Sequence, residues 1–329
     1  DLPQRQGHMY EAPVHTQAPQ DALTPTRHHH SGWWTASFSA ITRGLVAESK
    51  RDEDTATALI DAQSNGVAIS SEADKLNPWQ QFSAGARYGT LLHDLLEWLS
   101  LNQWPVARAD APAWSQQAWG TLLAQKTQWL NLNDADRAQL VPWLQAIITT
   151  PLPLDGAGTA PPSPALTLAQ LHSDDMWSEM EFNLEVGHVP AHVLDQHIQA
   201  HVFKGAPRPA LQDRVMQGML TGSLDLVLQH DDRYWVVDYK SNKLNRYDEE
   251  ALQAAVLNKR YDVQYVLYTL ALHRLLKVRL PNYDYAQHIG GAVYVFLRGI
   301  SEPGAGVHLH KPPQSLIETL DALFEKGSA

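Results

Sequence analysis

Apolar residues recur along this chain with the two periods that mark helices and strands. Between Tyr88 and Leu99, leucines repeat at helical spacing, which predicts an amphipathic helix. Between Trp177 and Val186, apolar residues alternate with glutamates, which predicts a strand with one polar face. The apolar run over residues 290–298 predicts a buried strand.

Two further strands are predicted to form a β-hairpin. The outgoing strand covers residues 224–228, and the returning strand covers residues 234–240 after a polar turn. Because side chains alternate along a strand, Asp238 and Lys240 point to the same face. Asp225 reaches the same place from the partner strand. The hairpin is therefore expected to bring two carboxylates and a lysine together.

Helical patterns flank these strands. They fall at about residues 86–150, 192–203, 249–279 (in two segments, divided near Tyr261) and 312–326. This order of elements predicts an α/β fold, in which a mixed central sheet is flanked by helices and a helical extension precedes the core.

The chain is expected to divide into an arm and one larger domain. Residues 1–75 are expected to be an N-terminal linker or arm, with a short ordered piece at 33–42 packed on the core. Residues 76–329 are expected to form the domain, with its helical extension at about 86–150 and its core at about 172–329. Residues 151–164, rich in proline, glycine and alanine, are expected to link the two parts.

Composition excludes several kinds of site. The 329 residues include no cysteine, so disulfides, thiolate zinc sites and cysteine-bound iron–sulfur clusters are excluded. No phosphate-binding loop of the Gly-x4-Gly-Lys-[Ser/Thr] type is present, so no ATP site is expected. No apolar run approaches the length of a membrane span, so no membrane partner is expected.

Charge is unevenly distributed along the chain. The net charge is −11, yet residues 233–298 carry ten Lys or Arg against six Asp or Glu. An acidic protein with a basic, metal-loaded groove can still hold DNA, although the same local excess is also common on ordinary solvated surface.

The predicted cluster of Asp225, Asp238 and Lys240 suits metal-assisted cleavage of phosphodiesters. Carboxylate oxygens are hard ligands that hold Mg²⁺. A bound metal lowers the pKa of water and neutralises charge on the phosphate, and a lysine stabilises the negative charge that develops. Alone, however, two aspartates and a lysine at this spacing are a loose pattern that also arises by chance.

Flanking residues make the pattern specific. Gly222-Ser-x-Asp225, Asp238-Tyr-Lys-Ser-Asn242 and Gln264-Tyr-x-x-Tyr268 resemble the RecB-type branch of the PD-(D/E)xK nucleases. The resemblance runs from about Trp33 to the end of the chain and is strongest from Met219 to Gly299. It also includes, in the same order, Trp33-Trp-x-x-Ser-Phe-Ser39, Gly89-Thr-Leu-Leu-His93, Glu179-Met-Glu-Phe182, Arg260-Tyr-Asp-x-Gln-Tyr265, Tyr268-Thr-Leu-Ala-Leu-His-Arg274 and Phe296-Leu-Arg-Gly299.

The resemblance implies a role for each site residue. It implies a metal held by His93, Asp225, Asp238 and the backbone carbonyl of Tyr239, with Lys240 assisting the attacking water. The remaining residues it implicates are Glu179 as a further acid (Glu181 is the alternative), Gln264 and Tyr268 lining the site, and Ser241 and Asn242 donating hydrogen bonds to DNA phosphates. Each of these roles has a simpler structural alternative. His93 could be a hydrogen-bonded core histidine, Lys240 could be an ion-pair partner of the two aspartates, and Glu179 could lie on a solvated strand face.

The resemblance further implies a DNA nuclease that uses Mg²⁺, whose site Mn²⁺ or Ca²⁺ can also occupy. Its expected partners are single-stranded DNA ends, RecC-like and RecD-like subunits, a helicase part of the same polypeptide, and RecA, and the implied location is the cytoplasm. Because the chain begins with Asp1 and holds no motor motif, we expect it to be the C-terminal part of a longer polypeptide.

The main alternative is a docking module for RecA or partner subunits, with little nuclease activity when isolated. A stand-alone restriction-type endonuclease is a weaker alternative. Whether one or two metals act stays open, as does the polarity of cutting.

Overall fold

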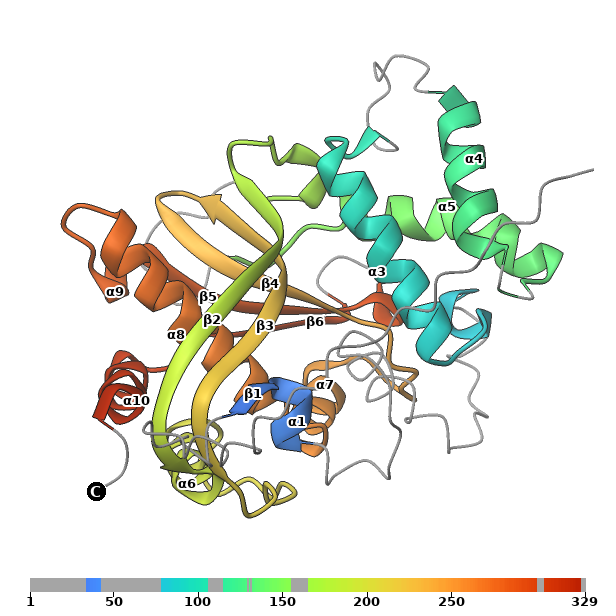
Figure 1. Ribbon diagram of the computed structural model, residues 1–329. Helices are drawn as coiled ribbons and strands as arrows, with labels where there is room; N and C mark the ends of the chain where they lie inside the picture. Colours follow the sequence, from blue (N-terminus) through green and yellow to red (C-terminus); the bar gives the residue numbers. More distant parts are fainter. Residues whose placement is uncertain are drawn as a thin grey trace, which may run out of the picture. The chain divides into compact units, whose positions relative to one another are not determined.

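The computed structural model describes residues 34–42, 78–105, 115–128, 130, 132–154, 165–300 and 305–326 (Figure 1). Most of the arm expected over residues 1–75, and most of the linker expected at 151–164, therefore lie outside the described residues. So does the expected boundary at residue 75, and the division into an arm and a domain stays a prediction.

Within the described residues, a mixed six-stranded sheet forms the centre. Its strand order is β1-β3-β4-β5-β6, with β2 paired to β3. The β1–β3 and β4–β5 pairs are parallel, and the other pairs are antiparallel. The strands are β1 (Trp34–Ser37), β2 (Met176–Pro190), β3 (Val215–His230), β4 (Arg233–Lys240), β5 (Ile289–Phe296) and β6 (Val307–His310). The predicted hairpin is thus confirmed as β3 and β4.

Helices cover both faces of this sheet. One hydrophobic cluster packs α6 (Ala191–His201), α7 (Glu249–Asn258), α8 (Tyr261–Arg279) and α10 (Gln314–Lys326) on one face. A second cluster packs α3 (Ala86–Leu101) and α5 (Asp134–Thr149) on the other. The shorter or peripheral helices are α1 (Phe38–Thr42), η3 (Pro78–Gln81), α4 (Ser115–Thr127), η5 (Leu168–Gln170), α9 (Tyr285–His288) and η6 (Leu297–Gly299). The predicted α/β class is confirmed. None of the helices in the described part of the chain is both long enough and apolar enough to cross a bilayer.

The leucine stripe of α3 explains how this helix docks. Leu92, Leu95, Leu96 and Leu99 have no exposed surface, and Leu91 is 2% exposed. Full burial of one such side chain contributes roughly 1.5–3 kcal/mol, so the stripe fixes which face of α3 turns to the sheet. Polar residues avoid the buried face of a helix, so His93 points away from the leucines.

A segment far away in sequence completes the sheet. Residues 34–37 of β1 pair in parallel with residues 218–221 of β3, and Phe38 and Ile41 pack into the core. The sequence predicted an ordered piece here but not a strand, because four residues are too few to show a period. The opposite half of β3 pairs with β4 from Leu226 onward. β2 pairs along one edge of β3, and β1 and β4 both pair along the opposite edge. Residues 222–225 of β3 lie in the gap between β1 and β4 on that edge.

The β2–β3 pair changes faces halfway along its length. Leu220 and Leu224 pack with the α8 cluster, whereas Leu226 and Leu228 pack with the α3 cluster. Even-numbered residues of a regular strand would all share one face. On β2 the same switch separates Met176 from Leu184. The pairing register is the same on both sides of the switch, so the two strands reorient together.

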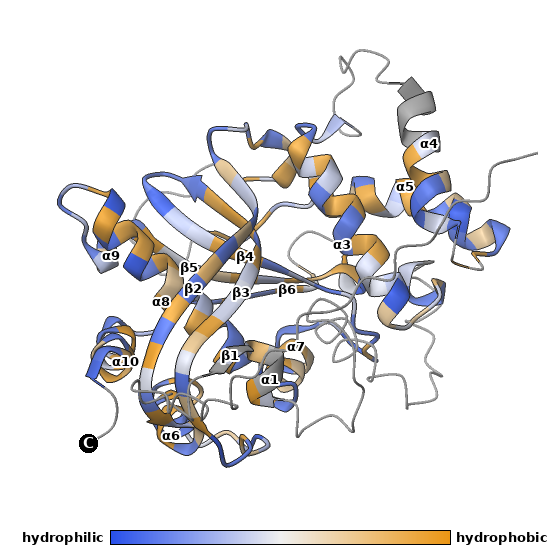
Figure 2. Ribbon diagram, viewed as in Figure 1, coloured by the Kyte–Doolittle hydropathy of each residue, from blue (hydrophilic) through white to orange (hydrophobic). Residues whose placement is uncertain are grey.

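Glu179 lies at the level of this switch. It is the only β2 residue recorded with a positive φ, of 47°, and continuing the register places it opposite Asp225. The alternation of hydrophilic and hydrophobic residues that follows along β2 is visible in Figure 2. Local reorientation of paired strands re-aims side chains, and such irregularities recur beside active sites.

Two buried histidines on β6 predict a pH-dependent stability. Burial lowers the pKa of His308 to about 4, helped by neighbouring His310, and burial lowers the pKa of His310 to about 4 as well. The unfolded chain binds these protons near pH 6.5, whereas the folded protein does not. The free energy of unfolding should therefore fall as pH drops from about 6.5 to about 4, by roughly 1.4 kcal/mol per pH unit for each histidine.

Denaturant unfolding at a series of pH values measures this effect. His310→Leu should flatten the pH dependence over that window, whereas the same change at the exposed His201 should leave it unchanged. An equally steep dependence in His310→Leu would show that this histidine is not the group responsible.

Candidate active site

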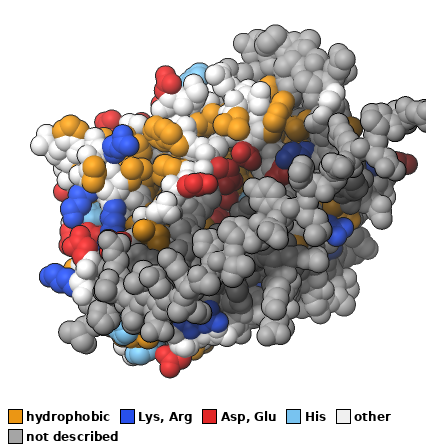
Figure 3. Space-filling model, in the orientation of Figure 1, with side chains coloured by type: hydrophobic (Ala, Val, Ile, Leu, Met, Phe, Trp, Pro, Cys, Tyr) orange, Lys and Arg blue, Asp and Glu red, His pale blue; other side chains and the backbone are white. Residues whose placement is uncertain are grey.

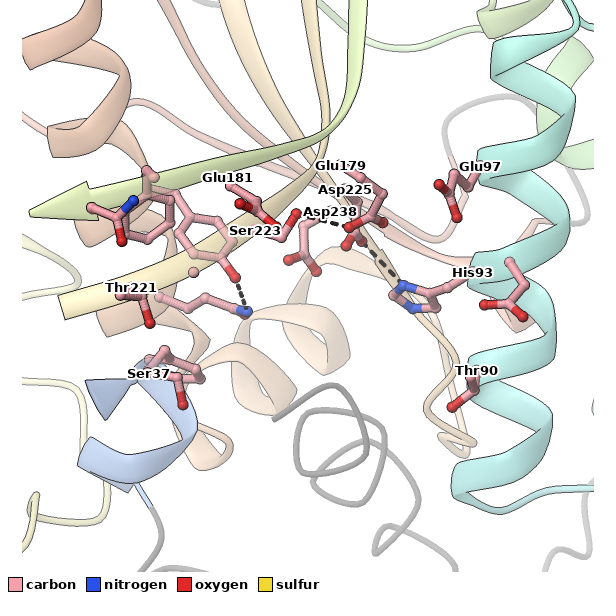
Figure 4. Close-up of a pocket in the computed structure, with 17 residues that line it drawn as sticks. Ser37, Thr90, His93, Glu97, Glu179, Glu181, Thr221, Ser223, Asp225 and Asp238 are labelled. Carbon is pink, nitrogen blue, oxygen red and sulfur yellow. Dashed lines mark hydrogen bonds and ion pairs between the residues drawn. The ribbon is translucent and has the colours of Figure 1, made fainter. Parts of the chain in front are cut away.

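A pocket of about 510 Å³ opens where α3, α8 and the β2–β3–β4 strands approach one another (Figure 4). The predicted site residues His93, Glu179, Asp225, Asp238, Gln264 and Tyr268 all line it, together with Glu97, Glu181 and Ser223. In Figure 4 the acids of β2, β3 and β4 point toward one another, and His93 faces them from α3. Residues separated by up to 175 positions thus meet in one hollow.

Asp225 is held from two sides. His93 Nδ1 lies 3.4 Å from Asp225 Oδ2, and the backbone N–H of Tyr239 donates to the same oxygen at 2.7 Å. Burial alone would raise the pKa of the Asp225 carboxyl, but His93, Lys240 and the Tyr239 N–H together lower it. Asp225 is therefore a carboxylate at neutral pH, oriented by the strand beside it.

Tyr239 itself does not line the pocket with its side chain, which packs in the α3 cluster with its ring edge-on to His93. Its backbone is the relevant part. The N–H and C=O of a strand residue point to the same edge of the strand. Because the Tyr239 N–H faces Asp225, its carbonyl faces the same edge of β4.

Asp238 and Lys240 lie on one face of β4, as strand alternation predicted. Their Oδ2 and Nζ atoms are 2.6 Å apart, and the side chains are 3% and 0% exposed. Lys240 Nζ also lies over the rings of Tyr261 and Tyr294, at 4.3 Å and 5.2 Å from their centroids. Asp238 lines the pocket, whereas Lys240 lies outside its lining. The structure thus places the lysine against Asp238 and outside the pocket lining, and its assistance to an attacking water stays a prediction.

Glu179 has a carboxyl whose pKa is raised in the pocket. Enclosure in the pocket, together with the Asp225 carboxylate, raises the pKa of Glu179 to about 7, against a hydrogen bond of 2.8 Å from Ser223 Oγ. Glu181 lines the same pocket two residues further along β2. Glu179 can therefore bind or release a proton near neutral pH, beside the ionised carboxylate of Asp225.

Gln264 and Tyr268 lie one turn apart on α8 and contact each other. Gln264 Nε2 donates to the Tyr268 hydroxyl at 2.9 Å, and Gln264 Oε1 accepts from the Tyr294 hydroxyl at 3.0 Å. Burial raises the pKa of Tyr268 well above its ordinary value, so its hydroxyl stays protonated. Both residues line the pocket as predicted, although the Gln264 amide is 1% exposed and already bonded at both ends.

Ser241 and Asn242 lie outside the pocket lining. Asn242 is 1% exposed, its Oδ1 accepts from the Tyr261 hydroxyl at 3.2 Å, and its carbonyl accepts from Tyr247. Asn242 therefore has a structural role within the protein, and its predicted contact with a DNA phosphate stays a prediction. The Ser241 carbonyl accepts from Arg298 Nε at 3.0 Å, and its predicted donation to phosphate stays a prediction.

Comparison with known proteins places the chain in a family. The family model of the PD-(D/E)XK nuclease superfamily matches residues 69–326. The chain belongs to the PD-(D/E)XK nuclease superfamily. It is similar to the RecBCD enzyme subunit RecB of Escherichia coli (36% identical over 272 residues, 80% of this chain and 21% of that protein). It is also similar to RecB of Haemophilus influenzae (41% over 188 residues, 55% and 15%) and of Mycobacterium tuberculosis (30% over 345 residues, 92% and 30%). The chain thus spans about a fifth of the length of the Escherichia coli relative.

Nucleases of this superfamily generally use divalent metals, and the pocket suits one in its chemistry. It combines carboxylate oxygens with an imidazole, a donor set that Mg²⁺ and Mn²⁺ accept. Burial is the main cause of the raised pKa of Glu179, and the nearby Asp225 carboxylate adds a repulsion that a bound cation would relieve. Among the residues that the structure describes, no three His, Asp or Glu side chains already stand at metal-holding spacing. Asp238 is turned to the Lys240 ammonium and Asp225 to the His93 imidazole, so side chains of the protein contact both carboxylates.

Two arginines of the resemblance motifs, neither assigned a role from the sequence, support this nuclease pocket. Arg298 is 1% exposed and donates to the backbone carbonyls of Trp79, Phe82, Ser83 and Ser241 at 2.8–3.0 Å. It thereby joins the residue after Lys240 to the segment that leads into α3. Arg260, in a left-handed conformation, pairs with Asp195 and Asp262 and fixes the start of α8. The carbonyl partners of Arg298 and the distant Asp195 partner of Arg260 left no signal in the sequence, although Asp262 follows Arg260 by only two residues.

Proposed function

We propose that this chain is a Mg²⁺-dependent DNA nuclease domain that hydrolyses phosphodiester bonds. The observation that carries the proposal is the meeting of His93, Asp225 and Asp238, from three different elements, in one acidic pocket. We further propose that the domain is the nuclease part of a RecBCD-like helicase–nuclease that acts in double-strand break repair and homologous recombination. The proposed activity of that complex is of the exodeoxyribonuclease V type.

In this proposal His93, Asp225, Asp238 and the Tyr239 carbonyl hold the metal, which supplies an activated water and neutralises phosphate charge. Lys240 assists the attacking water, and its ammonium lies 2.6 Å from Asp238 Oδ2. His93 orients Asp225. Glu179, with a pKa of about 7, is an acid able to accept or return a proton close to Asp225. Gln264 and Tyr268 present neutral polar groups to the DNA strand.

The remaining partners are part of the same proposal. They are single-stranded DNA ends, RecC-like and RecD-like subunits, a helicase part of the same polypeptide, and RecA, with a cytoplasmic location. Similarity to RecB proteins supports these partners.

Degradation of end-labelled single-stranded DNA tests the proposed activity. The parent should degrade DNA in Mg²⁺ and not in EDTA. Asp225→Asn keeps an acceptor for the Tyr239 N–H but removes the charge, and should lower the rate by about a thousandfold or more, the scale of losing a main electrostatic group. The matched control is Asp134→Asn, at an exposed position on α5, which should leave the rate unchanged.

Calorimetry with Mn²⁺ separates the remaining outcomes. Metal binding by the parent but not by Asp225→Asn, without cleavage by either, would mean that the site needs its complex. A parent that neither binds metal nor cleaves DNA would contradict the nuclease proposal and favour the docking module.

A further inference from the structure

A second hollow, of about 840 Å³, lies beside the candidate active site on the α8 side of the sheet. The two hollows share Glu181, Phe182 and Asn183 as a common wall. In Figure 3 some of the acidic side chains form a band near the centre of the face, and hydrophobic side chains lie next to this band. A substrate strand that extends from the acidic pocket across this wall would enter an apolar hollow.

This second hollow is lined by an aromatic pair, an exposed tryptophan on a half-buried tyrosine. Trp177 of β2 is 40% exposed and stacks on Tyr234 of β4, with ring centroids 6.1 Å apart and planes 29° from parallel. Phe182 and Leu275 continue the apolar surface. An open tryptophan face held flat by a second ring is a platform on which another planar group stacks.

Charge differs between the two ends of this surface. The wall shared with the active site carries Glu181, whereas the far side carries Arg274 and Arg279 of α8. Arg274 Nε and Lys277 Nζ lie 2.5 Å and 3.3 Å from the carboxylate oxygens of Asp321, so two cations share one anion there. The far side therefore keeps a positive balance, which suits phosphates, and the apolar middle suits bases.

We propose that this hollow binds the bases of single-stranded DNA next to the phosphate held in the active site, with a base stacked on Trp177. The inference rests on the proposed nuclease function and extends it by assigning a place to the bases of the single strand. Unpaired bases have free faces, whereas the bases of a duplex are already stacked on each other. Sequence preference should be weak, because every base offers a face for stacking.

Binding without cleavage tests the inference. The probe is a fluorescein-labelled oligothymidylate in EDTA, followed by anisotropy. Trp177→Leu keeps an apolar side chain but removes the ring, and should raise Kd about tenfold, within the range known for one stacked base. Trp177→Phe restores a ring and should bind nearly as tightly as the parent. Leu101→Ala, at an exposed apolar residue on α3, is the matched control and should bind like the parent.

Hydrolysis of methyl p-nitrophenyl phosphate separates this inference from the proposed function. This small phosphodiester has no bases, so Trp177→Leu should cleave it at the parental rate in Mg²⁺. If the parent cleaves neither this ester nor DNA and binds no Mn²⁺, but binds DNA in a ring-dependent way, the nuclease proposal fails and the base site stands.

Three results would overturn the base site. One is equal binding of the oligonucleotide by Trp177→Leu and the parent. A second is equal weakening by the Leu and Phe variants, which would indicate a surface for an apolar protein partner. The third is equally tight binding of a fully paired duplex.

Discussion

Replacing Asp238 alone should destabilise the protein far more than replacing Asp238 and Lys240 together. Asp238→Asn leaves the Lys240 ammonium, which has no exposed surface, without the carboxylate 2.6 Å away. Removal of one partner of a buried ion pair costs about 3–5 kcal/mol, because the other charge stays desolvated. For a domain of this size the melting temperature should fall by roughly 10 °C. The double variant Asp238→Asn/Lys240→Met removes both charges and should recover most of this loss.

Activity should behave differently from stability. The double variant regains its fold but lacks the Asp238 carboxylate, so it should neither bind Mn²⁺ nor cleave DNA. Chemical denaturation, calorimetry and the nuclease assay on the same three proteins measure both effects. Recovery of cleavage in the double variant would show that Asp238 is a structural partner of Lys240 and not part of the metal site.

An exposed ion pair of the same length is the control for this double-mutant cycle. Lys126 Nζ and Asp94 Oδ2 are also 2.6 Å apart, but their side chains are 42% and 32% exposed. Solvated pairs of this kind contribute about 0.2–1 kcal/mol. The coupling energy between Asp94→Asn and Lys126→Met should therefore be small, while the coupling energy between Asp238 and Lys240 should be several times larger.

Replacing Arg298 should weaken metal binding although this residue lies outside the pocket. Its guanidinium joins Ser241, next to Lys240 on one side of the site, to residues 79–83, which lead into the helix that carries His93. Arg298→Lys keeps the charge but offers three donors from one atom and not the flat fork that reaches four carbonyls. Each carbonyl left unbonded in the interior costs about 1–3 kcal/mol, so the free energy of unfolding should drop markedly.

The metal readout separates positioning from a purely structural role. If Arg298 positions α3, the Mn²⁺ affinity of the folded Arg298→Lys protein should fall by about tenfold or more, as happens when groups that orient ligands are removed. Arg274→Lys is the matched control, since Arg274 pairs with Asp321 on the far side of α8 and should leave the affinity unchanged. A destabilised Arg298→Lys variant with parental Mn²⁺ affinity would contradict the positioning role.

Local periodicity predicted the elements that carry the site. The leucine spacing of α3, the alternation of β2 and the hairpin of β3 and β4 all follow from side-chain patterns within a few residues. Asp238 and Lys240 share a face for the same reason. These predictions succeeded because burial of one face is a local requirement, which a short sequence window records.

What the sequence did not predict depends on contacts between distant residues. The parallel pairing of β1 with β3 joins segments more than 180 positions apart, and no periodicity announces it. The burial of Asn242 and the placement of Lys240 behind Asp238 depend on Tyr261, which comes from another element. The contacts of Arg298 are with backbone carbonyls, which every residue possesses, so no partner type was visible in advance.

The switch of faces at Glu179 and Asp225 makes this part of the chain intolerant of changes in length. Before the switch the apolar side chains of β2 pack in the α3 cluster, and after the switch they pack in the α8 cluster. A single residue inserted between Glu179 and Leu184 would turn every later apolar side chain of β2 to the wrong face, unless β3 gained a residue at the same level. Insertions and deletions in evolution should therefore spare this stretch, and the number of residues separating Glu179 from Phe182 should drift less than the identities of the residues between them.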